Sequence, residues 1–270
     1  MAIEGVTTGA YRANDYRPEE ERRYHVGIVI GPALSAWVVR DARNTHVAAL
    51  AWAAEERALK HADLPQHPRS VTFVALPEWS TLVPDGALEP GTAVDHLTLV
   101  HGKLPSHLVR EEPVQPLGAQ CLYVNESIHE RAVLDRYPIA RSLPLQGVLV
   151  HGARTRSMQG PTMLMHRGGE RLDIAIADKG NLLLSSSYPA RTAEDVLYFC
   201  LMAADRVGCD PGRLAVRLGG THLMTTDREL LGRYFVDTAS AVPPTTMATI
   251  PTTVEVDRWL AAFDQFACVS

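Results

Sequence analysis

Two adjacent glycines are the residues of this chain whose type and spacing could most directly serve a ligand. Gly219 and Gly220 follow the apolar run Leu214–Leu218, and Thr221 and a predicted helix come after them. Because glycine has no Cβ, two in succession let the backbone lie flat against a base or a ribose. The same pair also makes an ordinary turn between a strand and a helix. We therefore keep both interpretations of Gly219, Gly220 and Thr221: a nucleotide contact and simple turn geometry.

A serine cluster and a pair of adjacent acids have sufficient structural explanations. Ser185, Ser186 and Ser187 close a predicted strand, and they lack the G-x-S-x-G elbow that surrounds a hydrolase nucleophile. Glu194 and Asp195 are neighbours at a predicted helix start, where adjacent side chains diverge by about 100°. Acids at that end of a helix also interact favourably with its dipole. We predict no catalytic residue among these groups.

The sequence also lacks metal-binding spacings. None of the 11 histidines forms an H-x-H or H-E-x-x-H pattern, and the 4 cysteines include no C-x-x-C pair. Cys200 has apolar neighbours on both sides within a predicted helix, and we expect it to be a small core side chain. We therefore predict no metal site.

The composition sets limits on partners and compartment. The chain has 270 residues, 46% of them hydrophobic, which suits a globular protein of two lobes. Its net charge of -5 provides no global basic field for nucleic acid or an anionic membrane surface. The N-terminus lacks a secretory signal, and no apolar stretch reaches about 18 residues. We expect a cytoplasmic protein with no nucleic-acid partner and no membrane span.

The elements that must position the glycine pair follow a plan that is clearest in the second half of the chain. Three short runs joined by tight turns have the pattern of an antiparallel meander: Thr162–Arg167, Arg171–Ala177 and Asn181–Ser187. A helix is predicted from Thr192, whose hydroxyl is a good N-cap, to Gly208, which suits the C-terminal end. The plan is therefore three strands followed by a helix.

The first half of the chain repeats this plan. Strands are predicted at His25–Ile30, Ser35–Arg40 and His46–Trp52, and a helix is predicted through Glu55–His61. The two copies share no exact sequence repeat. The duplication is one of architecture only.

These patterns divide the chain into three parts. Residues 1–23 are polar, carry a run of charges and are expected to form a flexible N-terminal segment. The first lobe is expected to span residues 24–153 and the second residues 161–270. The Gly- and Pro-containing stretch Ala153–Pro161 is the expected boundary between them.

Further elements are expected between and after the two meanders, from short apolar or alternating runs bounded by Pro and Gly. The predicted strands are Ser70–Leu76, Glu78–Val83, His96–His101, Ala119–Asn125, Leu143–His151 and Leu214–Leu218; the helices are Ile128–Arg136, Thr225–Arg233 and Val254–Phe266; the loops are Lys103–Leu117 and Ala239–Thr253.

Part of the second lobe resembles a known family. The stretch Leu182–Tyr234, most specifically Thr192–Phe199, resembles a family of uncharacterised bacterial proteins classed as a domain of unknown function, DUF3822. Phe73–Leu76 and Thr81–Pro84 are similar to that family's first-lobe motif. The resemblance implies a divergent α/β fold of two actin-like (ribonuclease H-like) lobes, akin to pilus-assembly ATPases. Each lobe would be a mixed sheet with a three-stranded meander and flanking helices, and no activity is implied.

The turns that bind metal and phosphate in actin-like ATPases are altered in this chain. Those ATPases carry an Asp and glycines after the first strand of each lobe, which hold Mg²⁺, a water and the phosphates. Here the first-lobe turn, Gly31-Pro32, has no acid and one amide donor fewer. The second-lobe turn, His166–Arg171, has glycines but no Asp at the strand end. Glu170 or Asp173 could substitute for it, but acids at a hairpin tip are usually only solvated. Only Gly219–Thr221 resembles the adenosine-binding turn of these ATPases, which would take ATP or ADP.

Three functional hypotheses follow from these residues. The favoured one is a non-catalytic actin-like protein that acts as a scaffold or interaction module, with a protein partner or a second copy of itself. The first alternative is a nucleotide-binding protein with weak or no ATP hydrolysis, resting on Gly219–Thr221. The second is an enzyme of unrelated chemistry in the inter-lobe cleft. The missing metal-binding acids favour the first hypothesis and argue against an enzyme.

Overall fold

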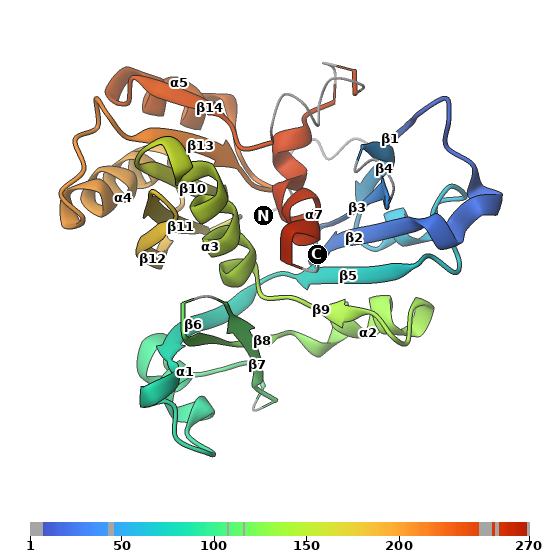
Figure 1. Ribbon diagram of the computed structural model, residues 1–270, viewed down its shortest axis with the longest axis horizontal. Coiled ribbons are helices and arrows are strands. Elements are labelled where there is room, and N and C mark those ends of the chain that lie inside the picture. Colours follow the sequence, from blue (N-terminus) through green and yellow to red (C-terminus); the bar gives the residue numbers. More distant parts are fainter. Residues whose placement is uncertain are drawn as a thin grey trace. The chain divides into compact units, whose positions relative to one another are not determined.

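The chain folds as two compact units, each built from separated segments (Figure 1). The computed structural model describes residues 8–42, 46–106, 108–115, 117–242, 250–251 and 254–268. Unit 1 is Met1–Leu145, Pro244–Val254 and Ala261–Ser270, and unit 2 is Gln146–Pro243 and Glu255–Leu260. The chain therefore passes from one unit to the other more than once.

The larger sheet of unit 1 is built on the first predicted meander. β2 (Tyr24–Ile30), β3 (Leu34–Asp41) and β4 (Val47–Ala54) pair antiparallel, and β5 (Ser70–Ala75) joins β2 in parallel. The strand order is β1-β4-β3-β2-β5-β9, with β9 (Arg141–Ser142) at one edge. β2 and β3 are near-continuous apolar runs because residues on both of their faces are buried.

The N-terminal segment differs from the flexible segment expected at residues 1–23. β1 (Gly9–Arg12) pairs with β4, and the 3-10 helix η1 covers Pro18–Arg23. Tyr16 is buried, packs against the ring of Tyr24 and donates its hydroxyl hydrogen to the Asp63 carbonyl. The prediction of flexibility rested on the polar composition of residues 1–23. One buried tyrosine hardly alters that composition, so the sequence pattern does not reveal this anchor. Residues 1–7 lie outside the described residues.

The helix predicted through Glu55–His61 is shorter in the structure. It is the 3-10 helix η2 (Arg57–Lys60). The Trp37 indole N–H donates to the Ala58 carbonyl at 2.8 Å, and the Ala58 N–H donates to the Ser35 hydroxyl at 3.2 Å. These two bonds use backbone groups that a longer α-helix would need, so the turn stays short.

A smaller sheet of unit 1 has the strand order β6-β8-β7. β6 (Glu78–Pro84) is followed by the 3-10 helix η3 (Asp85–Ala87), and β8 (Ala119–Asn125) leads into α2 (Ser127–Arg136), close to the predictions. β7 (Arg110–Val114) is a strand where a connection was predicted. Its charged residues are held by ion pairs, Arg110 with Glu130 and Glu112 with Arg141, which the sequence pattern does not reveal.

The predicted strand at His96–His101 is a helix. α1 spans Ala93–His101. Leu97 is fully buried, whereas Leu99 is 86% exposed, so the alternating pattern does not mark one buried face of a strand. The run is too short for its periodicity to separate the two structures.

The sheet of unit 2 contains the second meander and has the order β12-β11-β10-β13-β14 (Figure 1). β10 (Thr162–Arg167), β11 (Arg171–Asp178) and β12 (Asn181–Pro189) pair antiparallel, as the turn spacing predicts. β13 (Ala215–Gly219) and β14 (Asp237–Ser240) extend the sheet in parallel. The meander and its parallel extension place the ends of β10 and β13 together.

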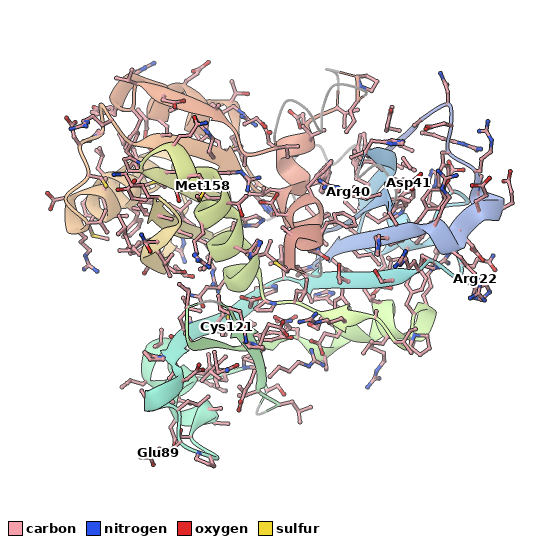
Figure 2. All side chains as sticks on the ribbon, in the orientation of Figure 1. Arg22, Arg40, Asp41, Glu89, Cys121 and Met158 are labelled. Carbon is pink, nitrogen blue, oxygen red and sulfur yellow. The ribbon has the colours of Figure 1, made fainter. Side chains whose placement is uncertain are left out.

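Helix α4 (Ala193–Arg206) forms as the sequence predicts. The Thr192 hydroxyl accepts the Asp195 N–H, and the Asp195 carboxylate accepts the Thr192 N–H, which is a full capping box. Gly208 follows the helix with a φ of 67°. Cys200 faces the core and is fully buried, and this burial raises the pKa of its thiol. The side chain of Cys121 on β8 is likewise buried (Figure 2).

The strand predicted at Leu143–His151 is a helix, which also moves the expected lobe boundary. α3 spans Leu145–Arg156 and continues into the 3-10 helix η4 (Ser157–Gln159). A short apolar run is compatible with a buried strand or a buried helix, and the pattern alone cannot separate them. The units therefore divide after Leu145, the first residue of this helix, rather than beyond the helix.

The C-terminal segment contributes residues 255–260 to unit 2 and residues 261–270 to unit 1. η5 (Val256–Trp259), α7 (Leu260–Asp264) and η6 (Gln265–Cys268) replace the single predicted helix at Val254–Phe266. The Gly220 N–H donates to the Asp257 carbonyl in unit 2, and the Gln265 amide donates to the Ile28 carbonyl in unit 1. Of the predicted loop 239–253, residues 239–240 belong to β14, and residues 243–249 and 252–253 lie outside the described residues.

The remaining helix, α5 (Thr225–Tyr234), follows β13 after a turn, as predicted. None of the helices in the described parts of the chain has the length and apolarity needed to cross a membrane.

Candidate functional site

The two turns that the sequence analysis singled out in unit 2 lie next to each other. His166 near the end of β10 pairs with Gly219 at the end of β13, in parallel register. The His222 N–H donates to the Arg167 carbonyl at 3.0 Å, which ties the two turns together. We call residues 166–170 and 219–224 the paired turns. The open carboxyl ends of parallel strands are a common place for ligands in α/β sheets, so this edge is the candidate site.

The glycine pair of this site is packed closely by its own chain. A Cβ on Gly219 would lie 2.6 Å from Leu260 Cδ2, and a Cβ on Gly220 would lie 2.2 Å from the Arg167 nitrogen. Gly220 also has a φ of 125°, which strains any other residue. The Gly220 N–H already donates to the Asp257 carbonyl at 2.9 Å. The chain therefore needs both glycines for its own packing, whether or not a nucleotide binds.

Thr221, the third residue of the candidate nucleotide contact, is also enclosed. Its side chain is buried, and its hydroxyl lies 2.9 Å from His222 Nδ1. Burial lowers the pKa of His222, and the nearby Arg167 and Arg258 lower it further. The hydroxyl therefore has a partner within the paired turns.

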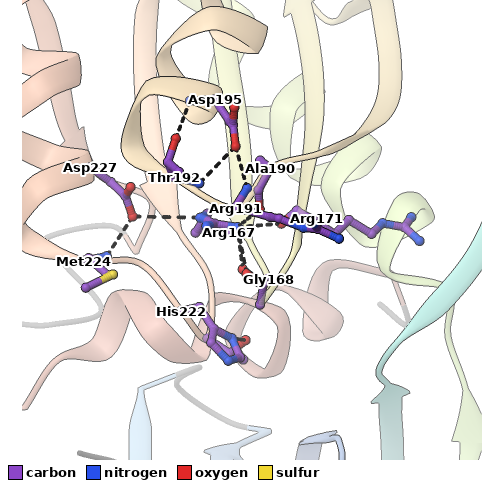
Figure 3. A network of polar contacts seen from close by, with 12 residues as sticks. Arg167, Gly168, Arg171, Ala190, Arg191, Thr192, Asp195, His222, Met224 and Asp227 are labelled. Atoms are coloured by element: carbon purple, nitrogen blue, oxygen red, sulfur yellow. Dashed lines mark hydrogen bonds and ion pairs between the residues drawn. The ribbon is translucent and has the colours of Figure 1, made fainter. Parts of the chain in front are cut away.

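Arg167 fills the turn after β10 (Figure 3). Its side chain is only 5% exposed, and one guanidinium nitrogen, Nη1, donates to the carbonyls of Gly168 at 2.8 Å and Ala190 at 2.6 Å. The same nitrogen is 3.2 Å from the Gly169 carbonyl. Burial lowers the pKa of Arg167, while the charge of Asp227 opposes that shift. The guanidinium thus closes the turn from inside.

The buried carboxylate nearest to Arg167 belongs to Asp227. Asp227 Oδ2 is 4.0 Å from Arg167 Nε and accepts the Met224 N–H at 2.9 Å, at the start of α5 (Figure 3). Burial raises the pKa of Asp227, and the Met224 bond and Arg167 act against that rise. Its position as a helix cap with an arginine partner accounts for the residue without a ligand.

His166 stands at the strand end where the resemblance requires an Asp. It is 1% exposed, and neither ring nitrogen has a hydrogen-bond partner in the part of the chain that the structure describes. Burial lowers the pKa of His166 to about 4, so the ring is neutral at pH 7. A neutral, enclosed imidazole carries no negative charge with which to hold Mg²⁺.

Asp173 on the neighbouring strand β11 lies directly opposite His166 in the antiparallel register. Its carboxylate accepts the Ser187 hydroxyl at 2.5 Å and Arg171 Nε at 2.6 Å. The Ser187 hydroxyl is therefore directed at Asp173 rather than at a histidine base, which is not the order of a hydrolase triad. These contacts make Ser187 and Asp173 part of a structural network.

The polar groups described at these turns are largely engaged within the chain. Across residues 8–268, excluding the undescribed gaps, no three His, Cys, Asp or Glu side chains come together as metal ligands. In unit 1, the Gly31 N–H at the other altered turn donates to the Leu34 carbonyl at 2.9 Å. A buried arginine cation beside the candidate site would also repel a divalent cation.

Sequence reasoning pointed to some residues of the paired turns and gave no indication of others. It identified Gly219–Thr221 and the lack of an Asp after β10. It did not find the inward guanidinium of Arg167 or the part played by Asp257, which lies far along the chain. Nothing in a single sequence marks an arginine as buried, so these residues gave no signal.

Comparison with known proteins decides the family. Residues 56–235 match the family described as "Protein of unknown function (DUF3822)". The chain belongs to the DUF3822 family. This confirms the resemblance that the Leu182–Tyr234 stretch indicated. No curated protein matches this DUF3822 protein.

Solved structures confirm the fold expected for this DUF3822 protein. A Bacteroides thetaiotaomicron protein with an actin-like ATPase fold and unknown function matches at a TM-score of 0.68 and 18% identity, over 82% of this chain and 91% of that chain. A chain of the PilM–PilN type IV pilus biogenesis complex matches at a TM-score of 0.50 and 13% identity, over 92% and 98%. At these identities the likeness shows the actin-like α/β fold and leaves the function open.

Proposed function

We propose that this DUF3822 protein is a non-catalytic member of the actin-like fold that works as a scaffold or interaction module. The observation that carries the proposal is the state of the turn after β10. Arg167 occupies that turn with its guanidinium, and a neutral His166 stands at the strand end. The acids nearest to that strand end do not stand in for the missing Asp: Glu170 is about three-quarters exposed and pairs with Arg191, and Asp173 is bonded to Arg171 and Ser187.

The electrostatics of the turn support the same conclusion. Mg²⁺ requires oxygen ligands, usually one or two carboxylates beside the phosphates. The carboxylates near the paired turns already have partners: Asp227 caps α5, and Asp257 accepts Arg228 Nη2 at 2.5 Å and the Ser240 hydroxyl. Releasing one of them for a metal would leave an arginine without its partner in a largely buried site.

A role in protein contacts has support from the fold relatives. The PilM–PilN structure is by its description a complex of two proteins. A fold that retains its packing but loses its metal-binding acids keeps surfaces that can be used for binding. The partner of this proposed module is another protein or a second copy of the chain.

A titration with nucleotides tests the proposal. Purified protein is melted with ATP, ADP and GTP, each with and without Mg²⁺, and phosphate release is measured in parallel. A nucleotide at about 100 times its dissociation constant would stabilise the fold by about 2.7 kcal/mol. We expect no shift at millimolar nucleotide and no phosphate release above the blank.

A saturable shift without hydrolysis would instead favour the nucleotide-binding alternative, and Mg²⁺-dependent phosphate release would overturn the proposal. A nucleotide-binding actin-like ATPase serves as the positive control in the same buffer. Gly220→Val is unsuitable as a control variant, because its side chain would collide with Arg167 whether or not a nucleotide binds.

A further inference from the structure

The outer edge of β12 is the longest uncharged sheet edge in the described parts of the chain. β12 stands at the end of the unit 2 sheet and pairs only with β11 among the described strands (Figure 1). Its nine residues, Asn181–Pro189, contain no charged side chain. Leu183 on this strand is 44% exposed. An open edge presents backbone N–H and C=O groups that a further strand can pair with.

One irregularity limits the regular part of this edge. Ile176 pairs with Leu184 and Ala177 with Leu182, so Leu183 is the extra residue of a bulge. Bulges are one of the devices that discourage edge pairing. The register is unbroken from Leu184 to Pro189, and proline lacks an N–H. The segment able to pair is therefore Leu184–Tyr188.

The other described sheet edges carry protection that this segment lacks. β1, β9 and β14 have four residues or fewer, and each carries a charge. β7 contains three charged residues and Pro113. β6 is longer, but α1 packs beside it and the His101 ring contacts the Ser80 carbonyl at 2.8 Å. Natural edge strands are protected by shortness, charge, proline or cover. Leu184–Tyr188 contains no charge and no proline. Tyr188 packs on Phe199 and Gln146 donates to the Ser185 hydroxyl, so its side chains are partly covered, while its outer backbone edge pairs with no described strand.

The segment is complementary to itself about a two-fold axis. In an antiparallel pair centred on Ser186, Leu184 lies opposite Tyr188 of the second copy, and Ser185 lies opposite Ser187. The serine hydroxyls already have partners within the chain, Asp173 for Ser187 and Gln146 for Ser185. The small serines therefore add no clash at the axis, the Leu184–Tyr188 pairs are apolar, and no like charges face one another. The closed two-fold pairing of identical edges is the commonest form of homodimer.

We propose that two copies of this chain associate through antiparallel pairing of their β12 strands at Leu184–Tyr188, which joins the two unit 2 sheets into one. This deepens the proposed function and rests on it, because it names a second copy as one partner of the module. The pairing uses backbone hydrogen bonds and a short segment, so the dimer is concentration-dependent.

Introducing a charge at the centre of the strand tests this pairing. Ser186→Lys and Ser186→Glu each place two like charges directly opposite one another at the axis. Sedimentation velocity of the full chain is expected to give twice 29.6 kDa for the unmodified protein at high concentration and 29.6 kDa for each variant alone. An equimolar mixture of the two variants is expected to regain the dimer, because lysine then faces glutamate. Ala239→Lys, on the exposed β14 edge of the same sheet, is the matched control and is expected to dimerise normally.

Three outcomes would overturn the pairing. In the first, the unmodified protein stays at 29.6 kDa up to its solubility limit. In the second, each Ser186 variant remains a dimer on its own. In the third, the mixture of the two variants does not regain the dimer. Should either variant fail to fold, amide exchange of the unmodified protein replaces it: amides of residues 184–188 must exchange more slowly as concentration rises, and unchanged exchange refutes the pairing. Failure here leaves the nucleotide titration unaffected, so the two proposals fail separately.

Discussion

Arg167 is the residue whose replacement should most directly reveal what the second-lobe turn is for. We predict that Arg167→Met lowers the free energy of unfolding by about 3–5 kcal/mol, because carbonyls and the buried Asp227 lose their cationic partner. Urea unfolding followed by circular dichroism measures this change. Arg167→Lys should recover only part of the loss, since an ammonium cannot reproduce the planar donor geometry of the guanidinium.

The matched control for Arg167 is a neighbouring arginine on the surface. Arg191 forms an ion pair with Glu170 in which both side chains are about three-quarters exposed. Arg191→Ala should change the stability by no more than about 0.5 kcal/mol. Similar losses for the two variants would mean that Arg167 is not the internal support of the turn.

His166 gives a second residue-level prediction, on pH dependence. Its pKa is lowered from about 6.5 in the unfolded chain to about 4 in the fold, because burial penalises the charged ring. Between these values the unfolded chain binds a proton that the folded chain does not. Stability is therefore complete above pH 6.5 and falls by about 3 kcal/mol in all as the pH drops towards 4.

Comparison with His166→Leu isolates this contribution. His25 and His222 also have pKa values lowered by burial, so they tilt the stability in the same direction and remain in both proteins. The variant should keep a stability within about 1 kcal/mol of the parent at pH 7, because neither ring nitrogen has a described partner to lose. A pH profile of unfolding that is unchanged by the substitution would refute the assignment.

Helix α4 allows a prediction at the level of the element. Thr192→Ala removes the side-chain acceptor of the Asp195 N–H and should cost about 1 kcal/mol of unfolding free energy. Thr226, exposed in the first turn of α5, is the matched control, and Thr226→Ala should change the stability by less than about 0.5 kcal/mol. Thermal or urea unfolding of both variants gives the comparison, and equal losses would argue against the capping box.

The elements themselves show what the sequence can and cannot predict. The two meanders were predictable because tight turns at Gly168-Gly169 and Asp178–Gly180 separate runs of strand pattern, and α4 because its cap, apolar face and terminal glycine agree. α1 and α3 were wrongly predicted as strands, because a short apolar run fits either structure until its neighbours are known. β7 was missed because its charges are neutralised by residues distant in sequence.

The candidate site divides in the same way. The turn at Gly219 and Gly220 is visible in the sequence, whereas the contacts with Leu260 and Arg167 that require glycine at these positions are not. The burial of Arg167 and His166 depends on the packing of β13, α5 and η5 around β10, and that packing is set by contacts far apart along the chain. The sequence thus predicts where the turns are and misses what fills them.

At the scale of the whole molecule, the C-terminal segment has one role in each unit. In unit 2, Leu260 packs against Gly219 and the Asp257 carbonyl accepts the Gly220 N–H. In unit 1, the Gln265 amide donates to the Ile28 carbonyl, and the Ala262 carbonyl lies where a Cβ on Gly27 would be. Neither unit is complete in a fragment that ends before this segment, although each has its own sheet.

Truncation after Val254 tests this dependence. Hydrogen exchange read by mass spectrometry should show faster exchange in β2 and in β13 with the following Gly220. β2 loses the packing at Gly27 and the Gln265 donor to Ile28, and the end of β13 loses the packing at Gly219 and the acceptor of the Gly220 N–H. Adding a peptide of residues 255–270 in trans should slow exchange in both strands, since the peptide restores the two sets of contacts. Faster exchange confined to one unit would mean that the segment supports that unit alone, and the two-unit role would be wrong. A peptide in which Leu260 is replaced by Asp is the control, and it should fail to protect β13, because a buried carboxylate would face Gly219 in place of the leucine.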